Sequence, residues 1–269
     1  MYYAPTGVFM FRIAIVVPTG VAAEIGGYAG DASLMVQLLA SIADEVLTHP
    51  NAVNAANFYT APPHVLYMEG YYLDQFFQKR IGIQKVLSNR IGLVIDRRCE
   101  EFLPLIENVV HATCITTGCQ VIGYTLTSEP INISFSPSEY GYHGHVIHAE
   151  DLLQASYQCL KKGANALAVL TYMDLLSSAE NQRYLQGGTV DPIGATEALI
   201  SHYLASELNV PIAHSPVFKP QITLERCDPR VCAEEIGTMY LPCILMGLSH
   251  APQIVSYQHS DFKLEDIHA

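Results

Sequence analysis

Apolar, β-branched runs alternate along this chain with segments whose apolar residues recur at helical spacing. The runs Gly92–Ile95 and Ala166–Leu170 contain no polar side chain, which indicates strands that are covered on both faces. Buried strands that alternate with helices are typical of an α/β fold with a mostly parallel sheet. We therefore predict a layered α/β sandwich.

The two periodicities also predict where the individual elements lie. Strands are expected at residues 11–17, 64–68, 91–95, 121–126, 131–135, 166–171 and 211–213. Helices are expected at residues 70–80, 99–113, 149–162, 192–207 and 229–247. A further helix is expected to begin near Asp31. Its apolar stripe would consist of Met35, Leu39, Ile42 and Val46.

Composition divides the chain into a short lead and two halves. Residues 1–10 are predicted to be a disordered or extra lead that lacks the features of a signal peptide. Residues 11–140 are predicted to form a first α/β half and residues 141–269 a second. The stretch 136–148, rich in Ser, Gly, Tyr and His, is predicted to be a linker or an active-site loop. Each half carries a glycine–aspartate turn, so the halves are interpreted as pseudo-repeats.

The glycine-rich turn after the first predicted strand is a candidate binding site. Gly26, Gly27 and Gly30 lack the Cβ atoms that would keep a ligand away from the backbone, and Asp31 follows where a helix begins. A helix N-terminus favours an anion. Because the turn matches neither the dinucleotide fingerprint nor the phosphate loop, it indicates an anionic metabolite, and the cofactor is unknown.

A second turn of this kind lies in the second half, where Gly187 and Gly188 lead to Asp191. We predict that both turns bind the same small anionic metabolite at one edge of the sheet. The alternative is structural, because Asp31 and Asp191 are good helix N-caps. In the same way, the negative charge of Glu197 interacts favourably with the dipole of the helix that follows Asp191, which is a structural role.

His49 and His214 are the candidate catalytic residues. Each follows a helix or a strand and enters a turn with a proline, where a neutral imidazole with a pKa of about 6.5 can transfer protons. Asn51, Asn54 and Ser215 lie beside them and are predicted to orient the substrate. A histidine in such a place is often a structural hydrogen-bonding residue, and this alternative stays open for both.

The densest group of possible metal ligands consists of His143, His145 and His148 with Glu150 and Asp151. The group lacks a recognised zinc pattern, and its two acidic residues are typical of the first turn of a helix. We therefore predict a solvated loop that leads into a helix, and we assign no metal ligand.

The composition indicates a globular protein that associates with itself. Of the 269 residues, 50% are hydrophobic and only 15% are charged, so part of the surface is predicted to be covered in a homo-oligomer. The formal net charge of -12 opposes binding to nucleic acid and to an anionic membrane. No apolar run reaches the roughly 18 residues of a membrane-spanning helix.

Seven cysteines, an odd number without a C-x-x-C pair, indicate neither a disulfide framework nor a zinc knuckle. We expect buried free thiols in the reducing environment of the cytoplasm. The spacing within the pairs Cys114/Cys119 and Cys227/Cys232 would let the two residues of each pair approach one another. No metal-binding partner accompanies either pair at a suitable spacing.

Five segments of the chain together resemble a known family. They are PTGVAAEIGGYAGDA at 18–32, THPNAVNAA at 48–56, YMEGY at 67–71, NRIGLVIDR at 89–97 and GGTVDPIGATEA at 187–198. From residue 11 to its end the chain resembles a family of functionally uncharacterised proteins, a domain of unknown function, from cyanobacteria, other bacteria and plastids. The resemblance implies no particular activity. Because members of this family are generally longer, it implies a further C-terminal section.

The sequence therefore predicts an enzyme of small-molecule metabolism that binds an anionic metabolite at its two glycine-rich turns. Glu69 and Glu129 stand alone at strand ends, and no nucleophile elbow or Cys–His signature is present. Isomerase, lyase and hydrolase chemistry are equally open. The alternative is a non-catalytic binding or assembly factor, in which the glycine turns serve close subunit packing.

Overall fold

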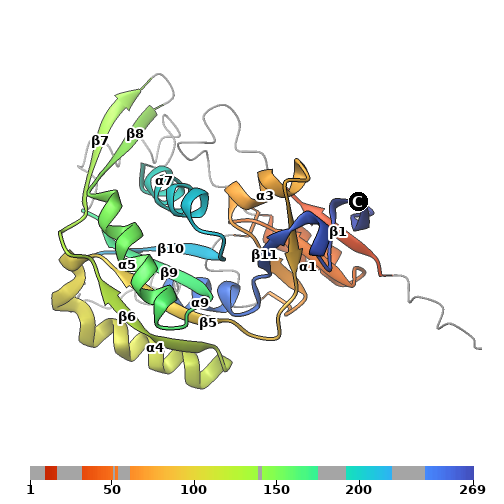
Figure 1. Cartoon of the computed structure of the whole chain (residues 1–269), viewed down its shortest axis with the longest axis horizontal. Coiled ribbons are helices and arrows are strands. Elements are labelled where there is room, and N and C mark those ends of the chain that lie inside the picture. The colour runs from red at the N-terminus through yellow and green to blue at the C-terminus, as the bar shows by residue number, and fades with distance from the viewer. Residues whose placement is uncertain are drawn as a thin grey trace, which may run out of the picture.

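The computed structural model describes residues 10–16, 32–50, 52–53, 61–138, 141–174, 192–219 and 240–269. Within these residues the strands form two parallel sheets and two antiparallel pairs, and helices lie on both sides of the parallel sheets (Figure 1). This confirms the predicted α/β fold with a mostly parallel sheet.

The first parallel sheet, sheet A, has its described strands in the order β1–β2–β3. They are β1 (Arg12–Ile15), β2 (Glu45–Thr48) and β3 (Val65–Tyr67). Ile13 of β1 pairs with Val46 of β2, and Val46 pairs in turn with Val65 of β3. Every residue of β2 and β3 is buried, so the sheet is covered on both faces.

The second parallel sheet, sheet C, has the strand order β10–β9–β5–β6. Its strands are β5 (Arg90–Ile95), β6 (Gln120–Leu126), β9 (Ala166–Tyr172) and β10 (Ile212–Val217). The central strands β5 and β9 are the two apolar runs from which the fold was predicted, and Leu93 pairs with Ala168 between them.

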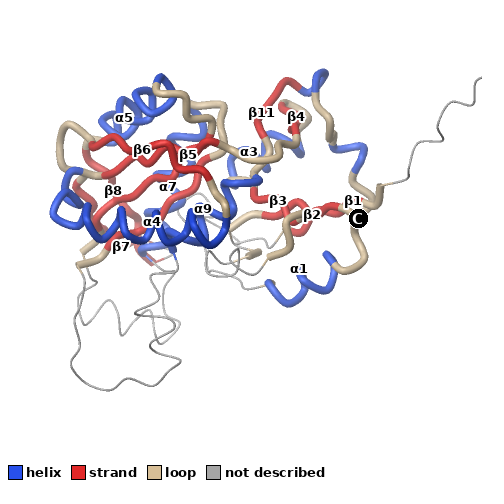
Figure 2. Tube along the Cα trace, turned by 90° about the horizontal axis from the view of Figure 1, so that it is seen from below, coloured by secondary structure: helices blue, strands red, loops and turns tan. Residues whose placement is uncertain are grey.

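Helices cover both faces of these sheets and complete a three-layer sandwich. One side carries α1 (Ser33–Ala40), α4 (Leu103–Thr117) and α9 (Tyr240–His250), and the other carries α3 (Gly70–Phe77), α5 (Ala149–Lys161) and α7 (Pro192–Glu207). Figure 2 shows α5 on one side of sheet C and α4 with α9 on the other.

Two hydrophobic cores result because successive residues of a strand point to opposite faces. Ile91, Leu93 and Ile95 of β5 belong to the core beneath α4 and α9, whereas Val94 belongs to the core beneath α5 and α7. Residues of both parallel sheets contribute to each core, so the two sheets pack as parts of one layer.

The two antiparallel pairs flank this sandwich. β4 (Ile81–Gln84) pairs with β11 (Gln253–Ser256), and β7 (Asn132–Ser138) pairs with β8 (Gly141–Ile147). Short 3-10 helices complete the described elements: η2 (Arg97–Phe102), η4 (Tyr257–His259) and η5 (Leu264–Asp266).

The prediction that residues 136–148 form an irregular linker or active-site loop is wrong. Most of this segment belongs to β7 and β8, which pair from Asn132 with Ile147 to Ser138 with Gly141. Cross-strand pairing gives regular structure to a sequence whose glycines and serines alone indicate a loop. The proposed division of the chain at residue 140 stays a prediction.

The prediction of one helix from Asp31 through Val46 is wrong beyond Ala40, where α1 ends. Val46 lies in β2, between β1 and β3. Within α1 the buried residues are Ser33, Val36 and Ala40, whereas Ile42, which belongs to the predicted apolar stripe, is 65% exposed. Pairing with the neighbouring strands therefore overrides the apparent helical spacing.

Asp44 marks the place where this segment leaves the helix and enters the sheet. Its carboxylate accepts a hydrogen bond of 2.7 Å from the main-chain N–H of Phe11, and its own N–H donates to the Phe11 carbonyl at 2.8 Å. These bonds join the beginning of β2 to the residue before β1 and so fix the parallel register.

The outer edge of β1 is paired with residues far along the chain. The N–H of His268 donates to the carbonyl of Arg12 at 2.8 Å, and the N–H of Ala14 donates to the carbonyl of Ala269 at 3.0 Å. In Figure 1 the C-terminus accordingly lies beside β1. The edge of sheet A is therefore covered.

Among the described helices, none combines the length and the apolar character needed to cross a membrane. The interpretation of the two halves as pseudo-repeats depends on the glycine–aspartate turns. Because both turns lie outside the described residues, this interpretation stays a prediction.

Candidate functional site

Buried polar side chains gather where the parallel strands end. They are Thr48 at the end of β2 with His49 after it, Glu69 after β3, Asp96 after β5, Thr171 in β9 and His214 in β10. The carboxyl ends of parallel strands are the usual place for ligands in α/β proteins. This edge is therefore the candidate site.

Two of these residues, Thr171 and His214, form a hydrogen-bonded chain with Glu197 of α7. Oγ1 of Thr171 lies 2.7 Å from Nε2 of His214, and Nδ1 of the same ring lies 3.2 Å from Oε1 of Glu197. In the neutral ring whose Nδ1–H donates to the Glu197 carboxylate, Nε2 accepts the hydrogen bond of the Thr171 hydroxyl.

Exposure within this chain increases from the sheet towards the helix. Thr171 is fully buried, and the side chain of His214 is 2% exposed, whereas that of Glu197 is 29% exposed. Glu197 is therefore the member of the chain that faces solvent, and the other two lie behind it.

Glu69, the residue before α3, is the centre of a second polar group, whose members Ser201 and His202 lie on α7. One of its oxygens accepts the N–H of Tyr71 at 2.7 Å and so caps α3. The other accepts the Ser201 hydroxyl at 3.1 Å and lies 2.9 Å from Nδ1 of His202. Glu197 and Ser201 are four positions apart on α7 and therefore lie on the same side of this helix, and His202 is the next residue.

The surroundings of His202 raise the pKa of its imidazole. Burial lowers this pKa, but the contact with Glu69 and its charge, together with the Ala198 main chain and the charge of Asp74, raise it by more. The positive form of His202 is therefore favoured beside the buried carboxylate.

His49 follows β2 and is buried, with 6% of its surface exposed. Burial lowers the pKa of its imidazole, and the charges of Glu69 and Asp74 counteract this only in part. His49 is consequently neutral at physiological pH. Its main-chain oxygen accepts the N–H groups of Ala52 and Val53 at 3.0 and 3.1 Å.

Asp96 is buried for a structural reason. Its carboxylate accepts the N–H groups of Arg98 at 3.0 Å, Ile131 at 2.9 Å and Tyr172 at 3.2 Å. Burial raises the pKa of Asp96, and these three bonds together with the charge of Arg98 counteract the shift. Asp96 thus joins the ends of β5 and β9 to the start of η2 and the segment before β7.

The structure describes His49, His214 and Ser215 among the predicted site residues. His214 and Ser215 are neighbours in β10, so their side chains point to opposite faces of sheet C. The remaining candidates, which are Gly26, Gly27, Gly30, Asp31, Asn51, Asn54, Gly187, Gly188 and Asp191, lie outside the described residues. Their roles stay predictions.

Sequence reasoning missed Thr171, Ser201 and His202 and did not pair Glu197 with His214. One available signal was that Thr171 ends a predicted apolar strand, where a polar residue faces the carboxyl edge. A second was the spacing of four between Glu197 and Ser201, which places two polar groups on one side of a helix. Their partners are distant in sequence, so spacing alone does not pair them.

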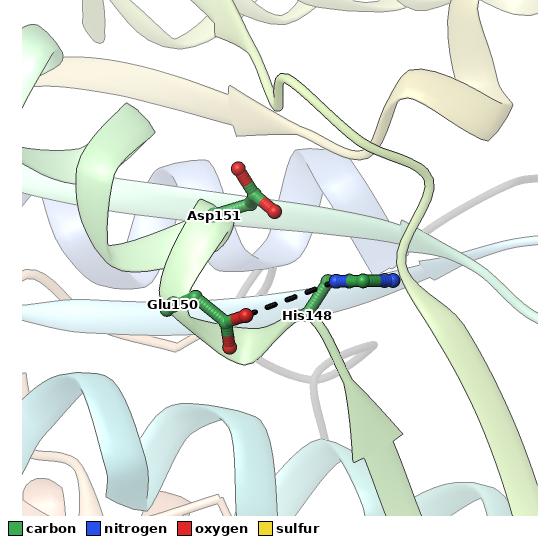
Figure 3. A group of neighbouring side chains, drawn as sticks. All are labelled: His148, Glu150 and Asp151. Carbon is green, nitrogen blue, oxygen red and sulfur yellow. Dashed lines mark ion pairs between the residues drawn. The ribbon is translucent and has the colours of Figure 1, made fainter.

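His148, Glu150 and Asp151 lie together at the start of α5 (Figure 3). One possible ligand atom of each lies within 4.8 Å of the others, and Nδ1 of His148 is 3.7 Å from a Glu150 oxygen. The N-terminus of a helix carries partial positive charge, which stabilises acidic residues there but opposes a cation. The group is explained as an acidic first turn and supports no metal assignment.

A cavity of about 260 Å³ lies between β8, α5 and α7, and its lining includes His145, Leu152 and Tyr203. None of its lining residues belongs to the polar groups around His214 and Glu69. The cavity is therefore separate from the candidate site.

The comparisons with known proteins agree with the family resemblance. A family model described as "Protein of unknown function (DUF3326)" matches residues 12–269. The chain is 39% identical over 249 residues to an uncharacterised lipoprotein of a Synechococcus strain, and the match covers 91% of this chain and 69% of the relative. No solved structure matches the chain. The chain belongs to the DUF3326 family of proteins of unknown function.

Proposed function

We propose that the protein is an enzyme of small-molecule metabolism whose acid/base group is Glu197, supported by His214. The observation that carries this proposal is the hydrogen-bonded chain from Thr171 through His214 to Glu197. It lies at the edge of a parallel sheet where ligands commonly bind. A carboxylate with an imidazole behind it can exchange a proton with a substrate while the ring compensates the change in charge.

The exposure of the three residues assigns their roles in this proposal. Glu197 is the most exposed and is the group that would touch the substrate. His214 is a positioning residue that orients the carboxylate, and Thr171 holds the ring from the other side. His49 is kept as a second candidate base, because burial lowers the pKa of its imidazole and leaves it neutral.

The proposed substrate is a small anionic metabolite. Asp191 directly precedes α7 in the sequence, so the second glycine turn leads into the helix that carries Glu197. Helix N-termini favour anions. The residues proposed to bind or orient the metabolite are Gly26, Gly27, Gly30, Asp31, Asn51, Asn54, Gly187, Gly188, Asp191 and Ser215.

The proposal is tested by proton exchange with a panel of small carboxylates and phosphate monoesters. Each compound is incubated with the protein in D2O, and NMR records hydrogen–deuterium exchange or conversion to product. We expect turnover of at least one compound by the wild type, its loss in Glu197→Gln, and a changed pH profile in His214→Asn. The shifted profile separates a positioning role from mere support of the fold.

Glu207→Gln provides the matched control, because Glu207 is an exposed carboxylate at the other end of α7. It should turn over the compound like the wild type. Turnover that persists unchanged in Glu197→Gln would contradict the proposal. So would the absence of turnover of every compound by the wild type.

A second candidate function, a non-catalytic binding or assembly factor, is favoured by the outer face of α1. Leu34, Leu38 and Ile42 are 83%, 60% and 65% exposed, and α1 contains no charged residue. A second copy of this chain is the proposed occupant, because only 15% of the residues are charged and homo-oligomers cover such faces.

Light scattering tests this self-association. The wild type is expected to exceed the monomer mass, and the double variant Leu34→Glu/Leu38→Glu is expected to be monomeric. Gln37→Glu, an exposed neighbour on the same helix, is the control for added charge and should associate normally. An assembly factor would keep its association in Glu197→Gln, whereas an enzyme would lose turnover in this variant with its fold intact.

The cytoplasm is the proposed location. Cys99 and Cys159 are buried free thiols, as expected in a reducing compartment. The relative from Synechococcus is named a lipoprotein, and a lipid anchor in this chain would place it at a membrane instead. Fractionation of cells into soluble and membrane material distinguishes the two locations.

A further inference from the structure

Two thiols lie in contact at the junction between α4 and β6. Sγ of Cys114 is 3.6 Å from Sγ of Cys119. Cys114 belongs to the last turn of α4, and the helix ends at Gly118, whose φ of 77° is the left-handed conformation that glycine adopts without strain. This turn brings Cys119 back against the helix end.

The other described thiols differ from this pair because they lie within the hydrophobic cores. Cys99 and Cys243 are 0% exposed and Cys159 is 2% exposed, and all three belong to the hydrophobic cores. Cys114 is only partly buried and Cys119 is 5% exposed. An oxidant from solvent can therefore reach the pair through Cys114.

The environments of the two sulfurs give them different reactivity. Burial raises the pKa of the Cys119 thiol to about 11, and the neighbouring Cys114 adds to the shift. Cys119 is consequently protonated at neutral pH, and it is poorly placed to react first because the thiolate is the nucleophile. Cys114 is the accessible member, and Cys119 lies behind it as the resolving thiol.

We propose that Cys114 and Cys119 form a redox site that hydrogen peroxide closes to a disulfide. The Cys114 thiolate attacks one peroxide oxygen, the O–O bond breaks, and the hydroxide that leaves takes up a proton and becomes water, which gives a sulfenic acid. The Cys119 sulfur then attacks the Cys114 sulfur. The S–O bond breaks, and the Cys119 proton leaves with the hydroxyl as a second water.

The reaction balances as two thiols and one peroxide to one disulfide and two waters. Two electrons pass from the sulfurs to the peroxide. The sulfurs must approach by about 1.6 Å from their present contact to reach disulfide bonding distance. A small dithiol reductant returns the pair to the thiol state by exchange.

The test uses the full chain with Cys227 and Cys232 replaced by serine, so that every remaining thiol has a described position. The protein is treated with hydrogen peroxide, the free thiols are alkylated, and peptide mapping locates them. We expect the loss of two thiols per chain, a disulfide between Cys114 and Cys119, and unmodified Cys99, Cys159 and Cys243. Dithiothreitol should restore both thiols.

The variant Cys119→Ser separates the roles of the two sulfurs. Without a resolving thiol the Cys114 sulfenic acid should persist and be labelled by dimedone, whereas Cys114→Ser should give no dimedone adduct at Cys119. The proposal is overturned if both thiols survive peroxide that oxidises free dithiothreitol completely. It is also overturned if peroxide leaves Cys119 free beside an oxidised Cys114, or if either residue pairs with another cysteine.

Discussion

The hydroxyl of Tyr67 donates a hydrogen bond of 2.9 Å to the main-chain oxygen of Ile212. Tyr67 ends β3 of sheet A and Ile212 begins β10 of sheet C, so this bond spans the two parallel sheets. Burial and the charges of Glu69 and Glu197 raise the pKa of Tyr67 well above its ordinary value. The hydroxyl therefore keeps its proton and remains a donor.

Replacing Tyr67 with phenylalanine tests this connection. The variant leaves the buried carbonyl of Ile212 without this donor, and we expect the free energy of unfolding to fall by about 1 kcal/mol. Urea unfolding measures the change. Tyr124→Phe, at a residue that is 37% exposed, is the control and should unfold like the wild type. Equal stability of the two variants would show that the bond contributes nothing.

The buried carboxylate of Glu45 in sheet A pairs with two basic side chains, Arg12 and Lys85. Its side chain is 1% exposed, with one oxygen 2.6 Å from Nε of Arg12 and the other paired with Lys85. Glu45→Gln removes the charge that both cations face. Because Lys85 is half exposed and partly solvated, we expect a loss of about 2 kcal/mol, less than for a fully buried pair.

Urea unfolding of Glu45→Gln measures this loss. The control is Glu265→Gln, which removes the exposed ion pair with Lys79, and it should leave stability nearly unchanged. A Glu45 variant as stable as the wild type would mean that removing the carboxylate from the interior offsets its ion pairs.

Gly92 lets α5 approach β5 closely. A Cβ atom at this position would lie 2.9 Å from the Cβ atoms of Ala164 and Cys159, closer than carbon atoms pack. We expect Gly92→Ala to reduce the free energy of unfolding by about 1–3 kcal/mol, the usual cost of overpacking. The double variant Gly92→Ala/Ala164→Gly removes one of the two contacts and should recover part of the loss. Full wild-type stability in the single variant would contradict the close contact.

His202 should stabilise the protein most at low pH. Burial lowers the pKa of His202, but the contact with Glu69, the Ala198 main chain and the charge of Asp74 together raise it by more, so the folded pKa lies above the unfolded value. The stabilisation is then complete below about pH 6.5 and is lost as the pH rises through the folded pKa. The difference in unfolding free energy between wild type and His202→Gln should therefore shrink from about pH 6 to about pH 8.

Unfolding of both proteins at several pH values checks this trend. His259→Gln, at an exposed histidine, is the control, and its difference from wild type should stay constant. A His202→Gln difference that grows with pH would show that burial, rather than Glu69, dominates the pKa of His202.

The contribution of His49 to stability should depend on pH in the opposite way. Burial lowers its pKa in the folded protein, and Glu69 and Asp74 offset this only in part. The unfolded chain then binds the proton more readily, so stability is retained above about pH 6.5 and falls as the pH drops through that value. Relative to His49→Gln, the wild type should lose stability on acidification. If acidification raised the unfolding free energy of the wild type relative to His49→Gln, the result would contradict a neutral, buried His49.

The central strands and several helices could be predicted because local pattern and tertiary context agree there. The apolar run at Gly92–Ile95 is buried in the core of sheet C, and the helices at 149–162 and 192–207 lie within a residue or two of α5 and α7. At β2 the local pattern and the tertiary context disagree. Glutamate has a low strand propensity, but the ion pairs of Glu45 with Arg12 and Lys85 allow it to be buried in this strand.

Long-range pairing explains what the sequence could not predict. β4 is stabilised by β11, whose residues Gln253–Ser256 lie in the last part of the chain, so neither strand is recognisable alone. The same holds for the candidate site. His214 was selected because a turn was predicted there, which is wrong, since β10 continues through His214 to Val217. Thr171 and Glu197 were recognised as its partners only when the fold placed β9 and α7 beside it.

The backbone bonds that His268 and Ala269 make to Arg12 and Ala14 have a consequence for the behaviour of the protein at high concentration. An open strand border offers a row of donors and acceptors that a foreign strand can adopt, which is how many proteins begin to form fibrils. At the outer edge of β1, His268 and Ala269 already form hydrogen bonds with these backbone groups. Fibril growth by strand addition would first have to peel these residues away from β1.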